Sequence, residues 1–177
     1  MRSRRLNTFF ISVLVFCLFC VSAYASEEGV LYSKAVKAAQ CGNIDFAFLY
    51  FSSLLDKCPD SKLAEKALFG TAEYYYLIGD YTDASQSFTQ FISKYPDSRA
   101  RLFALVYLLK ICQAKEKEDF VKKLRKEIIT FKQQSFLFRV FKKYQYRSPL
   151  YKHHKAIYYI DKVEFYIDEK LFTKILF

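Results

Sequence analysis

The chain has 177 residues, 53% of them hydrophobic, and a formal net charge of +10. Beyond residue 25 this is enough chain for one domain with a core, and no later apolar run is long enough to cross a bilayer. The three cysteines in that part are an odd number, so at least one thiol would be unpaired, and Cys41 and Cys58 at opposite ends of a predicted helix would lie about 24 Å apart, too far for a disulfide.

Residues 1–25 have the three parts of a signal peptide. Three arginines lie within the first five residues, residues 8–21 form an uncharged, mostly apolar run, and Ala23-Tyr24-Ala25 supplies small residues for a signal peptidase. As a helix the apolar run would span about 21 Å, short of the roughly 30 Å of a hydrocarbon core. We therefore expect cleavage after Ala25 and a periplasmic mature protein. The alternatives are an uncleaved anchor and a lipoprotein acylated at Cys17 or Cys20, although a bulky phenylalanine precedes each of these cysteines.

A block of twenty residues recurs at a spacing of 37. The repeated positions are a turn glycine, a small helix residue, an aromatic residue one turn later and a terminating proline, which together indicate a helix-turn-helix unit. The seven identical positions are Gly42, Ala47, Phe51, Lys57, Pro59, Asp60 and Ser61, which reappear as Gly79, Ala84, Phe88, Lys94, Pro96, Asp97 and Ser98. A helical repeat predicts a binding surface rather than a catalyst.

The predicted elements follow in chain order. The first unit contains helices over about 28–41 and 43–58, and the second contains helices over 63–78 and 81–95. A third, degenerate unit has a helix over 99–113 and a turn at 114–119 that lacks the glycine. After this turn an apolar face continues at Phe120, Leu124, Ile128 and Phe131.

The repeat disappears beyond residue 134. Residues 136–147 are apolar, aromatic and basic without a clear period, and Ser148-Pro149 breaks the segment. The apolar residues that follow suggest a closing helix: Ile157, Ile160, Val163, Ile167 and Leu171. Because terminal units of a repeat stack must cover an otherwise exposed core, we interpret the tail as a cap.

These residues resemble the tetratricopeptide repeat. In the second unit Leu68, Ala72, Tyr75, Gly79-Asp80-Tyr81, Ala84, Phe88 and Pro96 match its pattern, and in the first unit Leu31, Ala35, Gly42, Ala47, Phe51 and Pro59 do so. The longer period and the ending Tyr95-Pro96-Asp97-Ser98 are similar to the repeats of bacterial envelope proteins, namely the BamD-type outer-membrane assembly lipoproteins and the Tol-associated periplasmic coordinator. The resemblance covers about residues 28–113 and implies a scaffold of the cell envelope.

The predicted fold class is all-α, a right-handed stack of helical hairpins closed by a C-terminal capping segment. We expect a signal peptide over 1–25, repeats over 26–134 (28–61, 62–98 and a degenerate 99–134) and a basic, aromatic cap over 135–177.

The stack predicts a partner-binding groove. In stacked hairpins the first helix of each pair lines the concave side, where aromatic rings supply contact area and charged groups set orientation. The residues expected there are Tyr32, Val36, Lys66, Phe69, Glu73, Tyr76, Val106, Lys110 and Gln113. The alternative is that some of these rings pack against the C-terminal segment folded back into the groove.

A basic patch is a second candidate site. The segment from Phe120 to Lys155 contains eleven lysine or arginine residues and one acidic residue, Glu127. Such an excess of positive charge favours binding of an anionic partner. The predicted patch consists of Arg139, Lys142, Lys143, Arg147, Lys152 and Lys155. Export argues against nucleic acid, so anionic headgroups or an acidic protein suit it better, and an ordinary basic cap is the alternative.

No catalytic set stands out in the sequence, and we predict no enzyme activity, no cofactor and no metal site. His153 and His154 are adjacent, so on a helix they would point about 100° apart, and we interpret them as solvent-facing residues of a basic segment. The predicted function is a non-enzymatic periplasmic adaptor or scaffold that binds a protein or peptide partner in envelope or outer-membrane assembly. The alternative is a peripheral binder of an anionic envelope surface through the basic tail.

Overall fold

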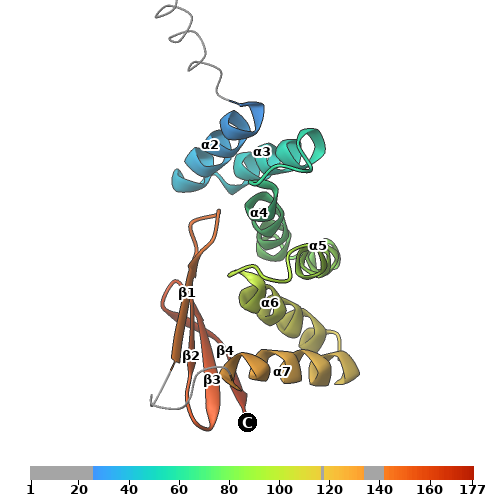
Figure 1. Ribbon diagram of the computed structural model, residues 1–177, viewed down its shortest axis with the longest axis vertical. Helices are drawn as coiled ribbons and strands as arrows, with labels where there is room; N and C mark the ends of the chain where they lie inside the picture. Colours follow the sequence, from blue (N-terminus) through green and yellow to red (C-terminus); the bar gives the residue numbers. More distant parts are fainter. Residues whose placement is uncertain (1–25, 117, 134–141) are drawn as a thin grey trace, which may run out of the picture.

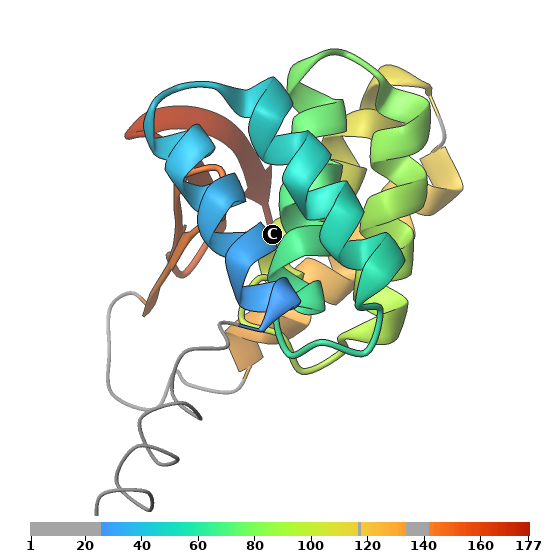
Figure 2. The same ribbon diagram turned by 90° about the horizontal axis from the view of Figure 1, so that it is seen from above.

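The computed structural model describes residues 26–116, 118–133 and 142–177, and it consists of a stack of helices with an antiparallel sheet along one side (Figures 1 and 2). Six helices form three consecutive hairpins: α2 (Glu27–Gln40) with α3 (Ile44–Lys57), α4 (Ala64–Leu77) with α5 (Tyr81–Lys94), and α6 (Arg101–Ala114) with α7 (Glu118–Gln133). None of the helices in these ranges is long and apolar enough to span a bilayer.

The helices keep the 37-residue period throughout, because α2, α4 and α6 begin 37 residues apart, as do α3, α5 and α7. The turn glycines Gly42 and Gly79 have φ of +77° and +83°, a left-handed conformation that favours glycine. The same position in the third hairpin is Glu116, which keeps a left-handed φ of +53° without glycine. The degenerate unit is therefore a full repeat in backbone geometry.

The chain ends in a sheet, so the all-α prediction is wrong. Its strands are β1 (Lys142–Arg147), β2 (His153–Tyr158), β3 (Lys162–Ile167) and β4 (Lys170–Leu176), paired antiparallel in the order β1-β2-β3-β4. Where we expected a closing helix, burial alternates with a period of two in β2 and at the start of β3, as in strands with one covered face. A two-residue turn at Asp168 and Glu169, with φ of +48° and +62°, joins β3 to β4.

The sheet covers α4 and α6, and α6 is consequently the most buried helix. Ten of its fourteen residues are buried, because α5, α7 and the sheet surround it. A single apolar cluster joins the second and third hairpins to the inner face of the sheet, including Ala156, Tyr158, Val163, Phe165 and Ile175. The first hairpin has its own smaller core.

The turn between β1 and β2 reaches into that smaller core. Leu150 is 3% exposed and packs with Ala35, Ala47 and Phe51 of the first hairpin. A Cβ added to Gly70 of α4 would lie 3.0 Å from the Phe51 ring and 3.3 Å from Cβ of Pro149, so this helical glycine allows the turn to approach closely. The β1–β2 turn therefore connects the sheet to the first hairpin.

Candidate functional site

The predicted groove is the surface on which the sheet lies. Phe69 and Glu73 are fully buried and Val106 is 3% exposed, whereas we expected all three to face an open groove, and that expectation is wrong. Tyr32, Val36, Tyr76, Lys110 and Gln113 are half-buried, and Lys66 is exposed. The alternative of a C-terminal segment folded back onto this face is the arrangement that the structure has. A partner-binding role for these residues stays a prediction.

Aromatic rings from the helices and the sheet interlock at this interface. The Phe69 ring lies 5.2 Å from the Tyr146 ring of β1 and 5.4 Å from the Phe91 ring of α5. Phe172 of β4 contacts Tyr76 and Tyr107 at 5.9 and 5.4 Å between ring centroids. Edge-to-face contacts at these distances are favourable beyond the area that they bury. Phe69 is thus part of the core.

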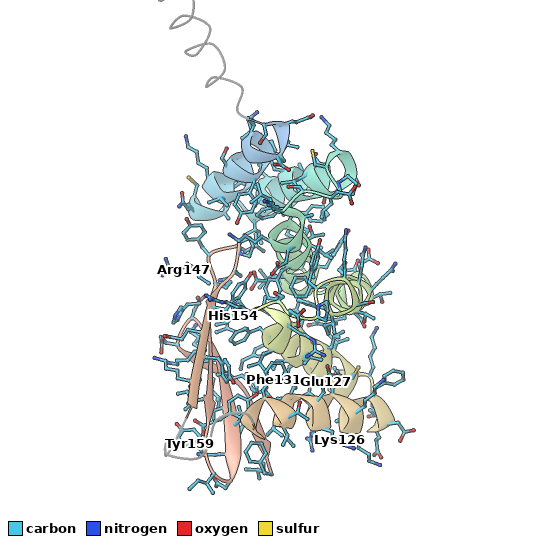
Figure 3. All side chains as sticks on the ribbon, viewed as in Figure 1. Lys126, Glu127, Phe131, Arg147, His154 and Tyr159 are labelled. Carbon is cyan, nitrogen blue, oxygen red and sulfur yellow. The ribbon has the colours of Figure 1, made fainter. Side chains whose placement is uncertain are left out.

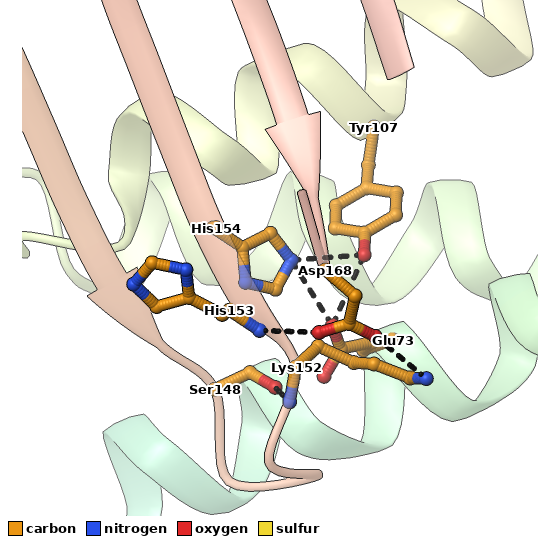
Figure 4. Close-up of polar contacts among 7 residues, drawn as sticks. All are labelled: Glu73, Tyr107, Ser148, Lys152, His153, His154 and Asp168. Carbon is orange, nitrogen blue, oxygen red and sulfur yellow. Dashed lines mark hydrogen bonds and ion pairs between the residues drawn. The ribbon is translucent and has the colours of Figure 1, made fainter. Parts of the chain in front are cut away.

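A buried polar cluster sits at the centre of the interface (Figure 4), formed by Glu73 of α4, Tyr107 of α6 and His154 of β2. The Tyr107 hydroxyl donates to Glu73 Oε1 at 3.0 Å and lies 3.0 Å from His154 Nε2, which is itself 3.1 Å from the same carboxylate oxygen. A hydrogen on Nε2 fits this network, because it donates toward the carboxylate while the tyrosine hydrogen does the same. Three different elements are thereby joined by hydrogen bonds.

The cluster is almost completely closed to solvent. The side chains of Glu73 and His154 are 0% and 1% exposed, and burial, with the Glu73 carboxylate adding to it, raises the pKa of Tyr107 well above its usual value. Glu73 Oε2 and His154 Nδ1 are buried without a hydrogen-bond partner in the described structure. A substrate has no access to such a place. We therefore interpret the cluster as the polar contact that fixes the sheet on the helices.

This location corrects the interpretation of the two histidines. His154 points from the sheet into the molecule (Figures 3 and 4), whereas we expected both histidines to face solvent. Adjacent residues of a strand point to opposite faces, so His153 lies on the outer side, where its Nδ1 is 3.4 Å from a Glu169 carboxylate oxygen. In the described ranges, no group of three or more histidine, cysteine or acidic residues is arranged to hold a metal ion.

The predicted basic patch lies partly on the opposite face of the sheet. Lys143 and Arg147 of β1 are exposed on that face. Lys152 forms an ion pair with Asp168 at 3.0 Å, and Lys155 pairs with Glu169. Arg139 lies outside the described residues, and Lys142 begins β1.

We define the outer sheet face by the outward positions of the four strands. Cross-strand pairing places Lys143, Ile157, Glu164 and Lys174 in one row and Gln145, Lys155, Tyr166 and Leu171 in the next, with Arg147 opposite His153. The Lys155 ammonium lies 4.8 Å from the centre of the Tyr166 ring, a cation–π contact that holds the lysine against the face. The face therefore combines basic, aromatic and aliphatic groups.

Acidic side chains are interspersed on and beside this face. The Lys162 ammonium lies 2.8 Å from Glu164, and the Tyr166 hydroxyl donates to the same carboxylate at 2.7 Å. These contacts, the Lys162 hydrogen bond first, lower the pKa of Glu164 below its usual value. At the β3–β4 turn, burial opposes ionisation of Asp168, but the His153 N–H and the Lys152 ammonium outweigh it and hold the pKa of Asp168 below its usual value.

Comparison with known proteins agrees with the repeat pattern. A protein-family model described as "YfiO: Outer membrane lipoprotein" matches residues 24–162, well over half of the chain and all six described helices together with β1 and β2. No curated protein matches the sequence.

Proposed function

Because the chain belongs to the YfiO family of outer membrane lipoproteins, we propose that it is a non-enzymatic adaptor that binds a protein partner during outer-membrane assembly. The family implies a role in envelope assembly, and the contact surface is our own inference. The observation that carries it is the sheet fixed over α4 and α6 by Glu73, Tyr107 and His154. With the inner face of the stack occupied, the outer sheet face becomes the surface offered to a partner.

The chemistry of the outer sheet face favours an acidic protein segment. Lys143, Arg147 and Lys174 are exposed on it, and Ile157 and Tyr166 lie between them in the cross-strand rows. Protein interfaces combine such aromatic and aliphatic contact area with charges that set orientation. The carboxylates of Glu164 and Glu169 break the positive surface, which suits a partner with a matching charge pattern better than a uniformly anionic bilayer.

Photo-crosslinking in cells tests this proposal. A photoreactive residue at position 143 or 157 should capture the same protein, and one at exposed Lys62, between the first and second hairpins, should not. When the photoreactive residue is at position 157, the variant Lys143→Glu with Arg147→Glu should lose the captured protein, because reversing two interface charges repels an acidic partner. The matched control, Lys122→Glu with Lys126→Glu on α7, should retain it. Capture that survives reversal of the sheet charges would overturn the assignment of this face.

A second candidate function rests on α7, where Lys122, Lys123, Arg125 and Lys126 are all exposed. Such a helix face suits peripheral binding to anionic headgroups, at about 1 kcal/mol per basic residue near the surface. Sedimentation with vesicles containing anionic phospholipid separates the two functions. Binding that disappears in high salt and in the α7 charge-reversal variant supports this candidate, and protein left in the supernatant at low salt excludes it.

We also propose that the mature chain begins at Ser26 and is periplasmic, held at the membrane by its partner. The family description names lipoproteins, and Cys17 and Cys20 are the cysteines of the leader segment that an acyl chain would modify. The phenylalanine before each cysteine is bulkier than the small residue expected at an acylation site. Intact mass of the envelope form decides the matter: a mass that begins at Ser26 supports the proposal, and an acylated amino-terminal Cys17 or Cys20 contradicts it.

A further inference from the structure

The first hairpin has an unusual outer surface. A groove of about 320 Å³ runs between α2 and α3, the hairpin at one end of the stack (Figure 1). Phe46, which lines the groove, and its neighbour Leu49 are 53% and 54% exposed. Terminal units of repeat stacks ordinarily present a polar outer face, because nothing packs on them. We call this surface the N-terminal groove; its lining is Lys34, Lys37, Ala38, Cys41, Asn43, Phe46 and Tyr50.

The repeat period shows what kind of element fits this groove. Shifted by 37 residues, Lys37 and Ala38 become Tyr74 and Tyr75 of α4, on which the first hairpin packs. Phe48 of α3 stacks on Tyr74 at 4.3 Å and meets Tyr75 edge-on at 5.2 Å. The N-terminal groove is thus the face that a preceding helix, equivalent to α3, would cover. In the ranges that the structure describes, no such helix precedes α2.

Charge indicates the chemistry of that helix. In the contact between the first two hairpins, Asp45 of α3 accepts a hydrogen bond from the Tyr74 hydroxyl at 2.8 Å. The equivalent of Tyr74 in the N-terminal groove is Lys37, which is exposed, as is Lys34 one turn earlier. A carboxylate placed as Asp45 is would therefore meet an ammonium group. The groove favours a helix that carries acidic side chains beside an apolar stripe.

A second copy of this chain fits poorly. If copies stacked end to end, the third hairpin would contribute the equivalents of Phe48 and Ser52, which are Lys122 and Lys126 of α7. Asp119 stands where Asp45 does, but the two exposed lysines would approach Lys37 and replace the aromatic contact with like charges.

We propose that the N-terminal groove docks an amphipathic, acidic helix of a partner protein, as a second binding surface distinct from the outer sheet face. Phe46 and Tyr50 line the groove one turn apart, and exposed Leu49 lies beside them on α3, so the three extend one apolar face toward the docked helix. Lys34, whose ammonium lies 5.8 Å from the centre of the Tyr50 ring, and Lys37 bind its carboxylates. Two separate surfaces are what an adaptor needs to hold two partners together.

Two synthetic peptides test the proposal. Each is an amphipathic helix of about 18 residues with one leucine face, long enough to form in isolation. In one peptide glutamates flank the leucine face. In the other peptide lysines take the place of the glutamates, and the leucines are unchanged. Fluorescence anisotropy with the mature protein should show binding of the acidic peptide at least tenfold tighter than of the basic one. The variant Lys34→Glu with Lys37→Glu should reverse this preference.

The variant Phe46→Ser with Leu49→Ser separates docking from simple charge attraction. Both side chains are half exposed, so the fold should persist by circular dichroism while affinity for the acidic peptide falls at least tenfold. The α7 variant Lys122→Glu with Lys126→Glu is the matched control and should bind as the unaltered protein does. Unchanged affinity after Phe46 and Leu49 are replaced would overturn the proposal, as would a dimer in size-exclusion chromatography that these replacements dissociate. Photo-crosslinking from position 143 tests the outer sheet face and does not depend on the peptide measurements. The proposal for the N-terminal groove and the proposal for the outer sheet face can therefore be refuted separately.

Discussion

Replacing His154 with alanine should destabilise the protein by about 3 to 5 kcal/mol, because it removes both a buried hydrogen-bond partner of Glu73 and a packed ring. The structure places the imidazole 3.1 Å from the Glu73 carboxylate, and Oε2 of that carboxylate already has no partner. After the substitution Glu73 keeps only its bond from Tyr107 inside an apolar interface. The imidazole also fills space beside the Phe69 and Phe103 rings, at 5.9 and 5.3 Å between centroids, so a cavity adds to the loss.

Urea unfolding followed by far-ultraviolet circular dichroism measures this loss, and the neighbouring histidine is the matched control. His153→Ala changes the same residue type in the same strand but on the outer face, so we expect a loss under about 1 kcal/mol. A double-mutant cycle with Glu73→Ala should give a coupling of about 1 to 3 kcal/mol, because each single substitution takes one hydrogen-bond partner from the other buried group. Equal losses for the two histidines, or a cycle without coupling, would refute the role of the cluster in holding the sheet.

Three further predictions concern separate elements. Glu116→Gly should stabilise the protein by about 0.5 to 1 kcal/mol in urea unfolding, because glycine relieves the left-handed backbone at φ +53°, and Glu116→Ala should give no such gain. Leu150→Ala should cost about 2 to 5 kcal/mol and increase hydrogen exchange in α2 and α3 first, whereas exposed Leu171→Ala should do neither. Asp168→Asn should cost less than about 1 kcal/mol at pH 7, and asparagine also tolerates the left-handed turn. Since folding lowers the pKa of Asp168, the stability that its carboxylate contributes is present above about pH 4 and is lost below it. The unaltered protein and the Asp168→Asn variant should therefore become equally stable in acid. A difference in stability that persists in acid would contradict this account.

The helical part of the fold was predictable because its boundaries carry local signals. Gly42 and Gly79 end the first helix of each hairpin and Pro59 and Pro96 follow the second, at positions that need only a few neighbouring residues to interpret. The third hairpin lost these markers, but Glu116 adopts the same backbone conformation because packing in the stack outweighs the preference for glycine. The helical period of the third hairpin was still detectable, from its apolar residues alone.

The sheet was missed because the inward residues of β2 do not form a recognisable apolar alternation. In β2 the covered positions are His154, Ala156 and Tyr158, so a hydrophobic alternation is hidden by a histidine and an alanine. Ile157 and Ile160 meanwhile mimic helical spacing from the outer face and the following turn. The burial of His154 depends on Glu73 and Tyr107 from two different helices, and no local pattern reports such a long-range pairing. The expectation that Phe69 faces an open groove was wrong for the same reason, since its cover comes from the C-terminal sheet.

The insertion of Leu150 into the first hairpin changes how this repeat protein should fold. In a simple stack each unit touches only its neighbours, and folding can begin at any unit and spread along the chain. Here the first hairpin completes its core only when a turn more than ninety residues later in the sequence has arrived. That long loop must close against chain entropy before its contacts reward it. The protein should therefore fold more slowly than an open stack and unfold in one cooperative transition, and the amino-terminal unit stays incomplete until the β1–β2 turn has docked on it.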